Sequence, residues 1–404
     1  MNSATTHDIA IPDLFSPEAA SNPYPIYNEI REQSPLVWYE RSGMWLFTRY
    51  QDVSALVRDP RLSSGHRHNS DRLPPQIRDK IKQMDESLSD WTVFLDGEDH
   101  LRLRHWLNKA FTPAAIAGLA PKIDEAIAHL LREVEGHDTF DMLRLIAGPL
   151  PAMVIGMILG VPAEDIGLVK QWSEGLSNFF SGKAPMAGPA AHEAMTEYVG
   201  HIVRDRRQSP QDDLISAMIH AEPSGRPLTD RELLANCVML LFAGHETTTR
   251  LMCNGMIALL QNPVQQDLMR RDPSVLVSGI EEFLRMEPAF LLVSRIVGND
   301  LEMHGAVIPT GSRIGLLIAA ANRDPRQFDR PDDFEAARHP NQHLSFGAGP
   351  HFCLGAPLAR TETRLLYQAL FRQFKSFVLA EELEWMGSAV FRVPKKVEVQ
   401  VVRN

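Results

Sequence analysis

The sequence predicts a mainly α-helical protein with small β-sheets. Apolar residues recur at helical spacing over residues 121–208, and glycine and proline interrupt the pattern at residues 148–149 and 160–162. A longer helical pattern covers residues 229–261, where nearly all faces are apolar, as expected for a helix at the centre of a protein. At 1.5 Å per residue this helix would be roughly 45 to 50 Å long.

The other predicted elements are shorter. Residues 36–39 and 44–48 flank Arg41-Ser42-Gly43 and predict a β-hairpin. A helical pattern follows over residues 51–58 and ends at Pro60. The break at residues 180–189 looks like the most flexible segment, and on sequence alone it could be an ordinary surface loop. Further strands are predicted near residues 301–308, 313–317 and 397–402.

The composition is that of a folded protein, with 44% hydrophobic and 23% charged residues. A length of 404 residues favours two or three domains. However, no Ser/Gly linker, long charge block or internal repeat divides the sequence, so we expect one domain over residues 1–404. The formal charge of −10 argues against general nucleic-acid binding, although a local basic patch could still bind an acidic protein.

The N-terminus and the cysteines indicate the compartment. Residues 1–8 have neither a basic start nor an apolar run long enough for a signal peptide or a membrane anchor. Cys237 and Cys253 lie in the long helical pattern, and Cys353 lies in a glycine-rich loop, so no disulfide framework is expected. We therefore expect a cytoplasmic protein without a membrane anchor.

The glycine-rich loop is the strongest functional signal. Residues 346–355 read Phe-Gly-Ala-Gly-Pro-His-Phe-Cys-Leu-Gly. Three glycines allow positive φ angles and close approach to a flat ligand. The amides that follow, and a helix beginning near Leu354, would favour a thiolate at Cys353. A cysteine in a tight turn can also be a small buried thiol, but a thiolate here suits an axial ligand of haem iron.

This loop resembles the haem-ligand signature Phe-x-x-Gly-x-x-x-Cys-x-Gly of the cytochrome P450 family. Phe346, Cys353 and Gly355 occupy fixed positions, and His351 makes the loop more similar to the soluble bacterial form. The resemblance extends from Asn-Pro-Tyr-Pro at residues 22–25 to the C-terminal strands. It implies a triangular prism, with haem (heme b) between the central helix and the cysteine-side helix. It also implies that residues 180–189 form a lid over the substrate pocket.

The middle of the central helix carries a second motif, Ala-Gly-His-Glu-Thr-Thr-Thr at residues 243–249, which is its least helix-favouring part. It resembles the family's oxygen-activation motif. Glu246 then matches the acid and Thr247 the alcohol of a proton-delivery pair, while Ala243 and Gly244 leave room for dioxygen and substrate. Alone, the run could be a helix kink. A zinc motif of the His-Glu-x-x-His type is not completed, because the fifth residue is threonine.

A third match is Glu282 with Arg285, which corresponds to the family's Glu-x-x-Arg. Residues three apart share a helix face, so a salt bridge is geometrically natural. Arg338 matches the usual third partner, and the three would hold the cysteine loop as a buried network. Without these companions, such a pair is common on solvated helix faces.

The resemblance also assigns haem and substrate contacts. The two haem propionates need cationic donors when partly buried. His100 and Arg104 match one propionate-binding pair, and Arg295 and His351 match the other contacts. The segments that line the family's pocket are mostly apolar here, which implies an apolar or amphipathic ligand. The candidate substrate contacts are Trp91, Val93, Phe94, Phe179, Phe180, Leu240, Leu292, Val293, Ala389 and Val390.

The implied activity is that of a haem-thiolate monooxygenase, which is expected to be a monomer and to oxidise a small organic substrate such as one of secondary metabolism. Since no flavin or iron–sulfur domain is found in the sequence, electrons are expected from NAD(P)H through an acidic ferredoxin and its reductase. A peroxide-driven peroxygenase is less favoured, because such enzymes tend to lack an acid–alcohol pair. A haem-based gas sensor or ligand carrier lacks support from a signalling domain. The expected docking cations are Arg102, Lys109, Arg360 and Arg364.

Overall fold

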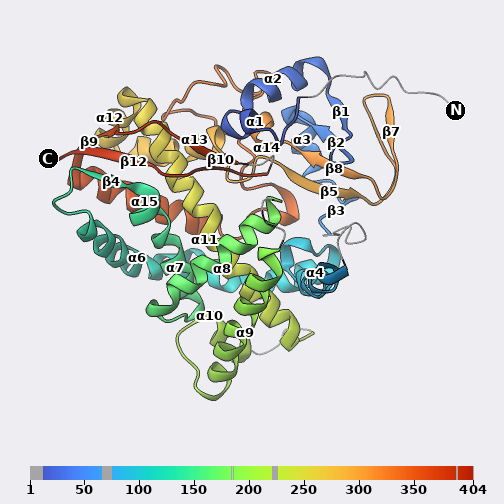
Figure 1. Cartoon of the computed structure of the whole chain (residues 1–404), viewed down its shortest axis with the longest axis horizontal. Helices are drawn as coiled ribbons and strands as arrows, with labels where there is room; N and C mark the ends of the chain where they lie inside the picture. Colours follow the sequence, from blue (N-terminus) through green and yellow to red (C-terminus); the bar gives the residue numbers. More distant parts are fainter. Residues whose placement is uncertain are drawn as a thin grey trace.

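The fold is built around one long helix, α11 (Asp230–Gln261), which crosses the middle of the molecule in Figure 1. The structure is a computed structural model that describes residues 12–65, 75–182, 184, 186–220, 226–387 and 390–403, without the side chains of residues 75–77 and 387. Thr229 caps α11 through a capping box with Glu232, which explains why the helix begins where the sequence predicts. Residues 1–8, on which the absence of a leader was predicted, lie outside the described residues.

Helices cover most of the central helix. Among them, α7, α8 and α9 contact α11 directly, and α6 packs on α15. The main helices before α11 are α2 (Tyr24–Gln33), α3 (Tyr50–Leu56), α4 (Pro75–Leu88), α5 (Gly97–Asn108), α6 (Pro113–Glu133), α7 (Pro149–Leu159), α8 (Ile166–Phe180), α9 (Ala187–Gln208) and α10 (Leu214–His220). Those after it are α12 (Pro263–Arg271), α13 (Pro273–Met286) and α15 (Ala356–Gln373), and the shortest are α1 (Pro17–Ser21) and α14 (Ile318–Ala321).

The predicted helical region of residues 121–208 is present, with two corrections. Its first helix, α6, begins at Pro113 because the Thr112 side chain caps it, and Pro121 lies inside the helix. A strand that was not predicted, β4 (Thr139–Asp141), follows α6. The predicted breaks are correct, since α7 begins after Gly148 and ends at a left-handed Gly160.

The strands form small sheets, as predicted. A five-stranded sheet has the order β1-β2-β8-β5-β3, in which the predicted hairpin pairs Leu36 with Phe47 and β2 runs parallel to β8. Its strands are β1 (Leu36–Tyr39), β2 (Met44–Phe47), β3 (Leu62–Ser63), β5 (Val293–Val297) and β8 (Arg313–Leu316). A three-stranded sheet joins β4, β12 (Glu398–Arg403) and β9 (Phe374–Leu379), and two further pairs join β6 (Leu301–Met303) to β7 (Ala306–Ile308) and β10 (Trp385–Gly387) to β11 (Arg392–Pro394).

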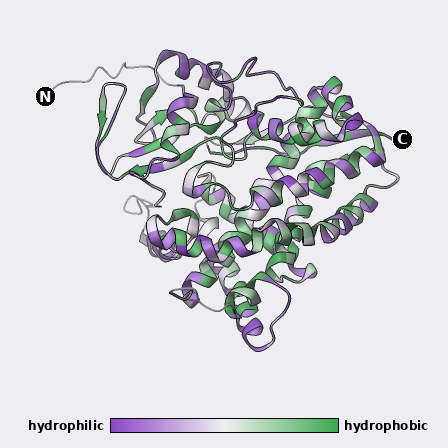
Figure 2. Cartoon of the chain, turned by 180° about the vertical axis from the view of Figure 1, so that it is seen from behind, coloured by the Kyte–Doolittle hydropathy of each residue, from purple (hydrophilic) through white to green (hydrophobic). Residues whose placement is uncertain are grey.

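The outline in Figure 1 is triangular, with the two larger sheets toward opposite ends of its broad side and α9 and α10 near the opposite corner. Figure 2 shows hydrophobic and hydrophilic residues on different sides of many helices, the pattern of helices that bury one face. Within the described residues, no helix combines the length and the apolar character that crossing a bilayer requires. The mainly α-helical fold with small sheets is therefore confirmed.

Candidate functional site

Cys353 lies in a tight loop immediately before α15. Its amide donates to the Phe346 carbonyl at 2.8 Å, which closes the loop on itself. Gly347 and Gly349 have φ angles of 67° and 70°, conformations that favour glycine. Gly355 differs from the expectation, since its φ is −82°; no described atom lies within 4 Å of a Cβ built there. Its lack of a side chain therefore leaves open space next to the cysteine loop.

Burial and polar contacts act in opposite directions on the pKa of the Cys353 thiol, and burial has the larger effect. Burial raises the pKa of the thiol, and the amides of Gly355 and Ala356 oppose this by donating to the sulfur. Arg104 and Arg360 also lower the pKa through their charge. The helix begins at Ala356, two residues later than predicted, so its first amide is one of these donors. Cys237 and Cys253 have only burial and nearby acids, which raise their pKa.

Two histidines and two arginines gather on the same side as this loop. His100 of α5 stacks on His351, with ring centroids 4.0 Å apart. The Nε2 atom of His100 is buried and has no hydrogen-bond partner among the described residues. Arg104 donates to the carbonyl of Phe352, beside Cys353. Arg295 of β5 is close enough to lower the pKa of His351 through its charge. The four predicted propionate contacts therefore come together.

The electrostatics of this group fit an anionic ligand. The pKa of His351 is lowered to about 4, mainly by burial and in addition by the charges of His100 and Arg295. Burial and Arg104 likewise lower the pKa of His100. The positive charges of Arg104 and Arg295 thus lie in a partly buried region, next to the His100 Nε2 atom that has no hydrogen-bond partner among the described residues. Two carboxylates, such as those of a haem, are ligands that this donor set can hold.

Sequence reasoning missed Asp96, which lies among these cationic groups. Its Oδ1 atom is 3.5 Å from His351 Nε2. Its carboxylate accepts hydrogen bonds from Ser63 Oγ at 2.6 Å and from the Ser64 amide at 3.1 Å. Asp96 immediately precedes α5 at the N-cap position, but its side chain makes no capping hydrogen bond there. Its contact with His351 depends on two segments that are far apart in the chain.

The predicted proton-delivery pair lies on α11. The Thr247 hydroxyl donates to the Ala243 carbonyl at 2.8 Å, one turn earlier in the helix. Glu246 accepts a hydrogen bond from Arg250 at 2.8 Å. The neighbouring His245 has its Nε2 atom 3.2 Å from the Gly148 carbonyl and its Nδ1 atom 3.7 Å from Glu246 Oε1. Among the residues that the structure describes, no group of three or more His, Cys, Asp or Glu side chains that could hold a metal ion is found.

The room for dioxygen beside Ala243 and Gly244 stays a prediction, and the structure adds a packing role for Gly244. A Cβ built on Gly244 would lie 2.9 Å from two side-chain atoms of Ile155 on α7. That contact is too close for a real side chain, so glycine here lets α7 pack against α11. The position that a side chain at residue 244 would occupy is therefore filled by α7.

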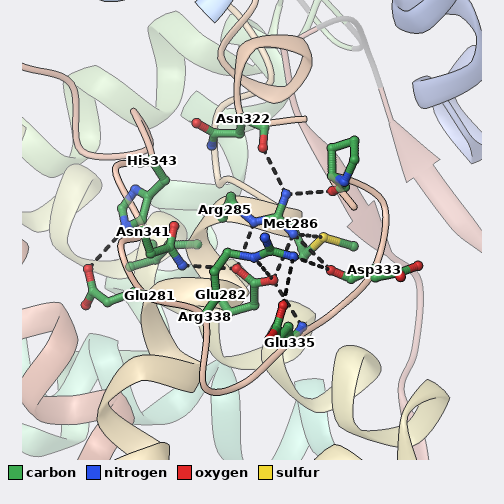
Figure 3. Close-up of polar contacts among 12 residues, drawn as sticks. Glu281, Glu282, Arg285, Met286, Asn322, Asp333, Glu335, Arg338, Asn341 and His343 are labelled. Atoms are coloured by element: carbon green, nitrogen blue, oxygen red, sulfur yellow. Dashed lines mark hydrogen bonds and ion pairs between the residues drawn. The ribbon is translucent and has the colours of Figure 1, made fainter. Parts of the chain in front are cut away.

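Figure 3 shows the predicted network of Glu282, Arg285 and Arg338. Glu282 and Arg285 are completely buried on α13, and Arg285 donates to both carboxylate oxygens at 2.7 and 2.8 Å. Arg338 donates to the same carboxylate at 2.9 Å. These hydrogen bonds lower the pKa of Glu282 although burial opposes them. The salt bridge predicted from the three-residue spacing is therefore present and buried.

This network holds the irregular chain that leads to the cysteine loop. Arg285 also donates to the carbonyls of Asn322, Pro331 and Asp333 at 3.0, 2.6 and 3.0 Å. The Asn322 side chain in turn accepts from the Leu344 amide and donates to Ser345, just before the loop begins. Arg285 and the Asn322 side chain together thus fix backbone at points between residues 322 and 345, which explains how this coil can be well packed.

The candidate substrate contacts divide into groups. Trp91, Phe94, Phe179 and Phe180 form one aromatic cluster, together with Phe242, which the sequence analysis did not select. Leu240 is buried in α11, Leu292 is buried, Val293 begins β5, and the Val390 carbonyl accepts from the Leu291 amide at 2.9 Å. Val93 is 44% exposed and points away from the buried cluster, and Ala389 lies outside the described residues.

The predicted basic docking face is weaker than expected. Arg102 pairs with Glu232 and Asp99, and Arg360 is held by both oxygens of Glu281 at 2.7 Å. Lys109 lies over the Trp106 ring, and Arg364 donates to Gln368. Two of the four cations are therefore largely neutralised within the chain.

Comparisons with known proteins show which family the chain resembles over most of its length. The family model described as Cytochrome P450 matches residues 162–400. The chain is 33% identical to the polyketide biosynthesis cytochrome P450 PksS of Bacillus subtilis, over 94% of this chain and 96% of the relative. It is 35% identical to the vitamin D(3) 25-hydroxylase of Pseudonocardia autotrophica, over 94% of each. The crystal structure of P450BioI in complex with a fatty-acid-ligated acyl carrier protein superposes with a TM-score of 0.88 at 32% identity, covering 95% of this chain and 100% of that one.

Proposed function

We infer, since this chain belongs to the cytochrome P450 family of haem monooxygenases, that Cys353 is the thiolate ligand of its haem iron. The observation that carries this assignment is the loop itself, in which two backbone amides and two guanidinium groups act on the sulfur of the half-buried Cys353. When bound, the haem supplies the activation of dioxygen and the transfer of one oxygen atom to substrate. The protein supplies the sulfur ligand, the polar contacts and the proton route.

The residues that would hold the propionates are Arg104, Arg295, His100 and His351. Their support is the stacked histidine pair, the buried His100 nitrogen without a partner, and the two nearby guanidinium groups. A carboxylate placed among them gains charge-assisted hydrogen bonds and raises the pKa of both imidazoles. The buried Glu282, Arg285 and Arg338 network keeps the loop in place for this purpose.

We assign proton delivery to Glu246 and Thr247. The Thr247 hydroxyl donates its hydrogen bond to the Ala243 carbonyl. The lone pairs of its oxygen therefore remain able to accept a hydrogen bond from a proton-bearing group in the pocket. Glu246 is one residue away and only partly exposed, which suits a carboxylate that passes protons inward to a largely dry site. In this proposal Thr247 orients the proton-bearing group, and Glu246 resupplies the protons.

The proposed substrate is an apolar or amphipathic small organic molecule, which would be hydroxylated or epoxidised. The buried aromatic cluster around Trp91 supports this class, and so do the names of relatives that act on vitamin D(3) or take part in polyketide biosynthesis. We propose that electrons come from NAD(P)H through an acidic ferredoxin and its reductase. Lys109 and Arg364, the less neutralised of the four cations, are the better candidates for its docking face.

A spectral titration tests this function. The purified haem-loaded protein is titrated with terpenoids, fatty acids, steroids and polyketides while the spin state of the iron is followed. Ligands that shift the spin state are then incubated with NAD(P)H, ferredoxin and reductase, and products are identified. Oxygenated product that requires dioxygen and the electron donors supports a monooxygenase. Turnover with hydrogen peroxide alone would instead indicate a peroxygenase, and binding without any turnover would indicate a sensor or carrier.

A further inference from the structure

Five aromatic rings meet where α8, α9 and α11 approach the segment before α5. Trp91 stacks nearly parallel to Phe94, with centroids 6.1 Å apart, and lies 6.0 Å from Phe242 of α11. Phe180, at the end of α8, lies 6.3 Å from Trp91 and 5.4 Å from Phe242. His192 of α9 lies 6.4 Å from Trp91. We call these five residues the aromatic cage.

Two nitrogen atoms in the aromatic cage lack partners. Trp91 is 2% exposed and His192 is 6% exposed. Neither Trp91 Nε1 nor His192 Nε2 has a hydrogen-bond partner among the described residues. Buried polar atoms in native proteins are nearly always paired, so two such atoms on neighbouring rings point to a ligand group. The two nitrogen atoms belong to rings whose centroids lie 6.4 Å apart.

The aromatic cage is held in place from both sides. Asn236 of α11 donates to the Asp90 carbonyl at 2.9 Å and accepts from the Thr92 amide at 2.9 Å, so the backbone on each side of Trp91 is fixed. A Cβ on Gly188 would lie 2.5 Å from two atoms of Phe179, which shows how closely α8 and α9 pack beside His192. The backbone that carries Trp91 is therefore fixed, and α8 and α9 pack closely one turn before His192.

The charge of the aromatic cage restricts the ligand. Burial lowers the pKa of His192 to about 4, so its imidazole is neutral near pH 7. A neutral imidazole and an indole N–H can pair with a hydroxyl or carbonyl oxygen, whereas they give a carboxylate no compensating charge. The surrounding rings offer flat apolar surface to the rest of the molecule.

We propose that Trp91 and His192 form a polar subsite of the substrate pocket, which binds the hydroxyl or carbonyl oxygen of a neutral substrate with planar rings. The inference rests on the proposed function, because it places the aromatic cage in the pocket of the monooxygenase. Its position supports this, since Phe242 directly precedes Ala243 and lies one turn before Glu246 on α11. His192 then determines specificity without taking part in the chemistry.

Equilibrium dialysis with two ligands of nearly equal size tests the subsite in the haem-loaded protein. The probes are 2-naphthol and 2-methylnaphthalene, which differ by a hydroxyl in place of a methyl group. The variants are Trp91→Phe and His192→Phe, which keep a ring and remove nitrogen, His192→Gln, which keeps a polar group, and Phe180→Leu as the apolar control. Circular dichroism and haem content confirm that each variant is folded.

The wild type is expected to bind 2-naphthol about tenfold more tightly than 2-methylnaphthalene, the effect of roughly one net hydrogen bond. Trp91→Phe and His192→Phe should bring this ratio near one, and His192→Gln should retain part of it. Phe180→Leu should weaken both ligands and keep the ratio. A wild-type ratio near one, failure to bind either probe, or an unchanged ratio in both ring-keeping variants would overturn the subsite. The reduced carbon monoxide spectrum of the same samples reports separately on the haem-thiolate assignment, so the two failures are distinguishable.

Discussion

The guanidinium of Arg250 lies 2.8 Å from the carboxylate of Glu246, one turn away on α11, and only 3% of the arginine side chain is exposed. Arg250 also donates to Ser177 of α8 at 2.9 Å and lies over the Phe391 ring at 4.2 Å. Burial lowers the pKa of Arg250, and Glu246 opposes this through its charge. The proposed catalytic acid is therefore also the main compensation for a buried cation.

This relationship separates two roles of Glu246. Glu246→Gln should slow turnover and also destabilise the fold by about 3 kcal/mol, because it leaves a buried charge without its partner. The double variant Glu246→Gln/Arg250→Met should recover most of the stability, since the charge is removed, while turnover stays slow. Urea unfolding and product formation are measured on the same preparations. A double variant that regains both stability and turnover would show that Glu246 has only a structural role.

Thr247→Ala should leave folding and haem content nearly unchanged, because among the described residues the hydroxyl donates only to a carbonyl of its own helix. It should still consume NAD(P)H with substrate and donor proteins present, but release hydrogen peroxide in place of most of the product. The measurement is product formed and peroxide released per NAD(P)H consumed. Thr248→Ala, which changes a buried neighbouring hydroxyl, is the control and should keep product formation coupled. Equal coupling in wild type and Thr247→Ala would move the proton route to another group.

Arg285→Lys should be far more damaging than a charge-conserving change suggests. Lysine keeps the charge but cannot reach Glu282 and three backbone carbonyls together, so buried acceptors are left unpaired. We expect a loss of about 3 to 5 kcal/mol in unfolding free energy and poor haem incorporation. Arg271→Lys, at an exposed pair with Asp267, should cost less than about 0.5 kcal/mol. Similar losses in the two variants would contradict the role of the buried network.

Glu281 should make the free energy of unfolding depend on pH in the acidic range. Burial opposes ionisation, but hydrogen bonds from Arg360 and His343 lower the pKa of Glu281 to about 2. A lowered folded-state pKa stabilises the protein above the unfolded value near 4.5, and this stabilisation, about 3 kcal/mol, is lost as pH falls from there toward 2. Glu281→Gln should therefore be less stable than wild type at about pH 7, and the difference should narrow below about pH 4. A difference that is constant down to about pH 3 would rule out this linkage.

Local signals explain what the sequence could predict of the fold. The hairpin and α11 depend on turn residues, caps and periodicity within one segment, and both appear where expected. Strand β4 was missed because it has three residues and pairs Phe140 with Val399, more than 250 positions away. Nothing in residues 139–141 alone distinguishes a strand from a loop.

The same distinction applies to the site. The motifs located Cys353, Thr247 and Glu282 because spacing within a motif is a local property. Arg250 could have been found, since it is one turn from Glu246 on a predicted helix. Asp96 and His192 could not, because their importance comes from neighbours on other elements. The packing role of Gly244 could not be predicted either, because it depends on the contact between α7 and α11.

The central claim is that Cys353 provides the thiolate ligand, and the spectrum of the reduced carbon monoxide complex tests it most directly. Wild type should show the strongly red-shifted Soret band of a thiolate-ligated haem, and Cys353→Ser should lose it. Cys253→Ser, which changes a buried cysteine in α11, is the matched control and should keep the band in the folded fraction. A thiolate-type band that persists in Cys353→Ser, or disappears in folded, haem-loaded Cys253→Ser, would contradict the account.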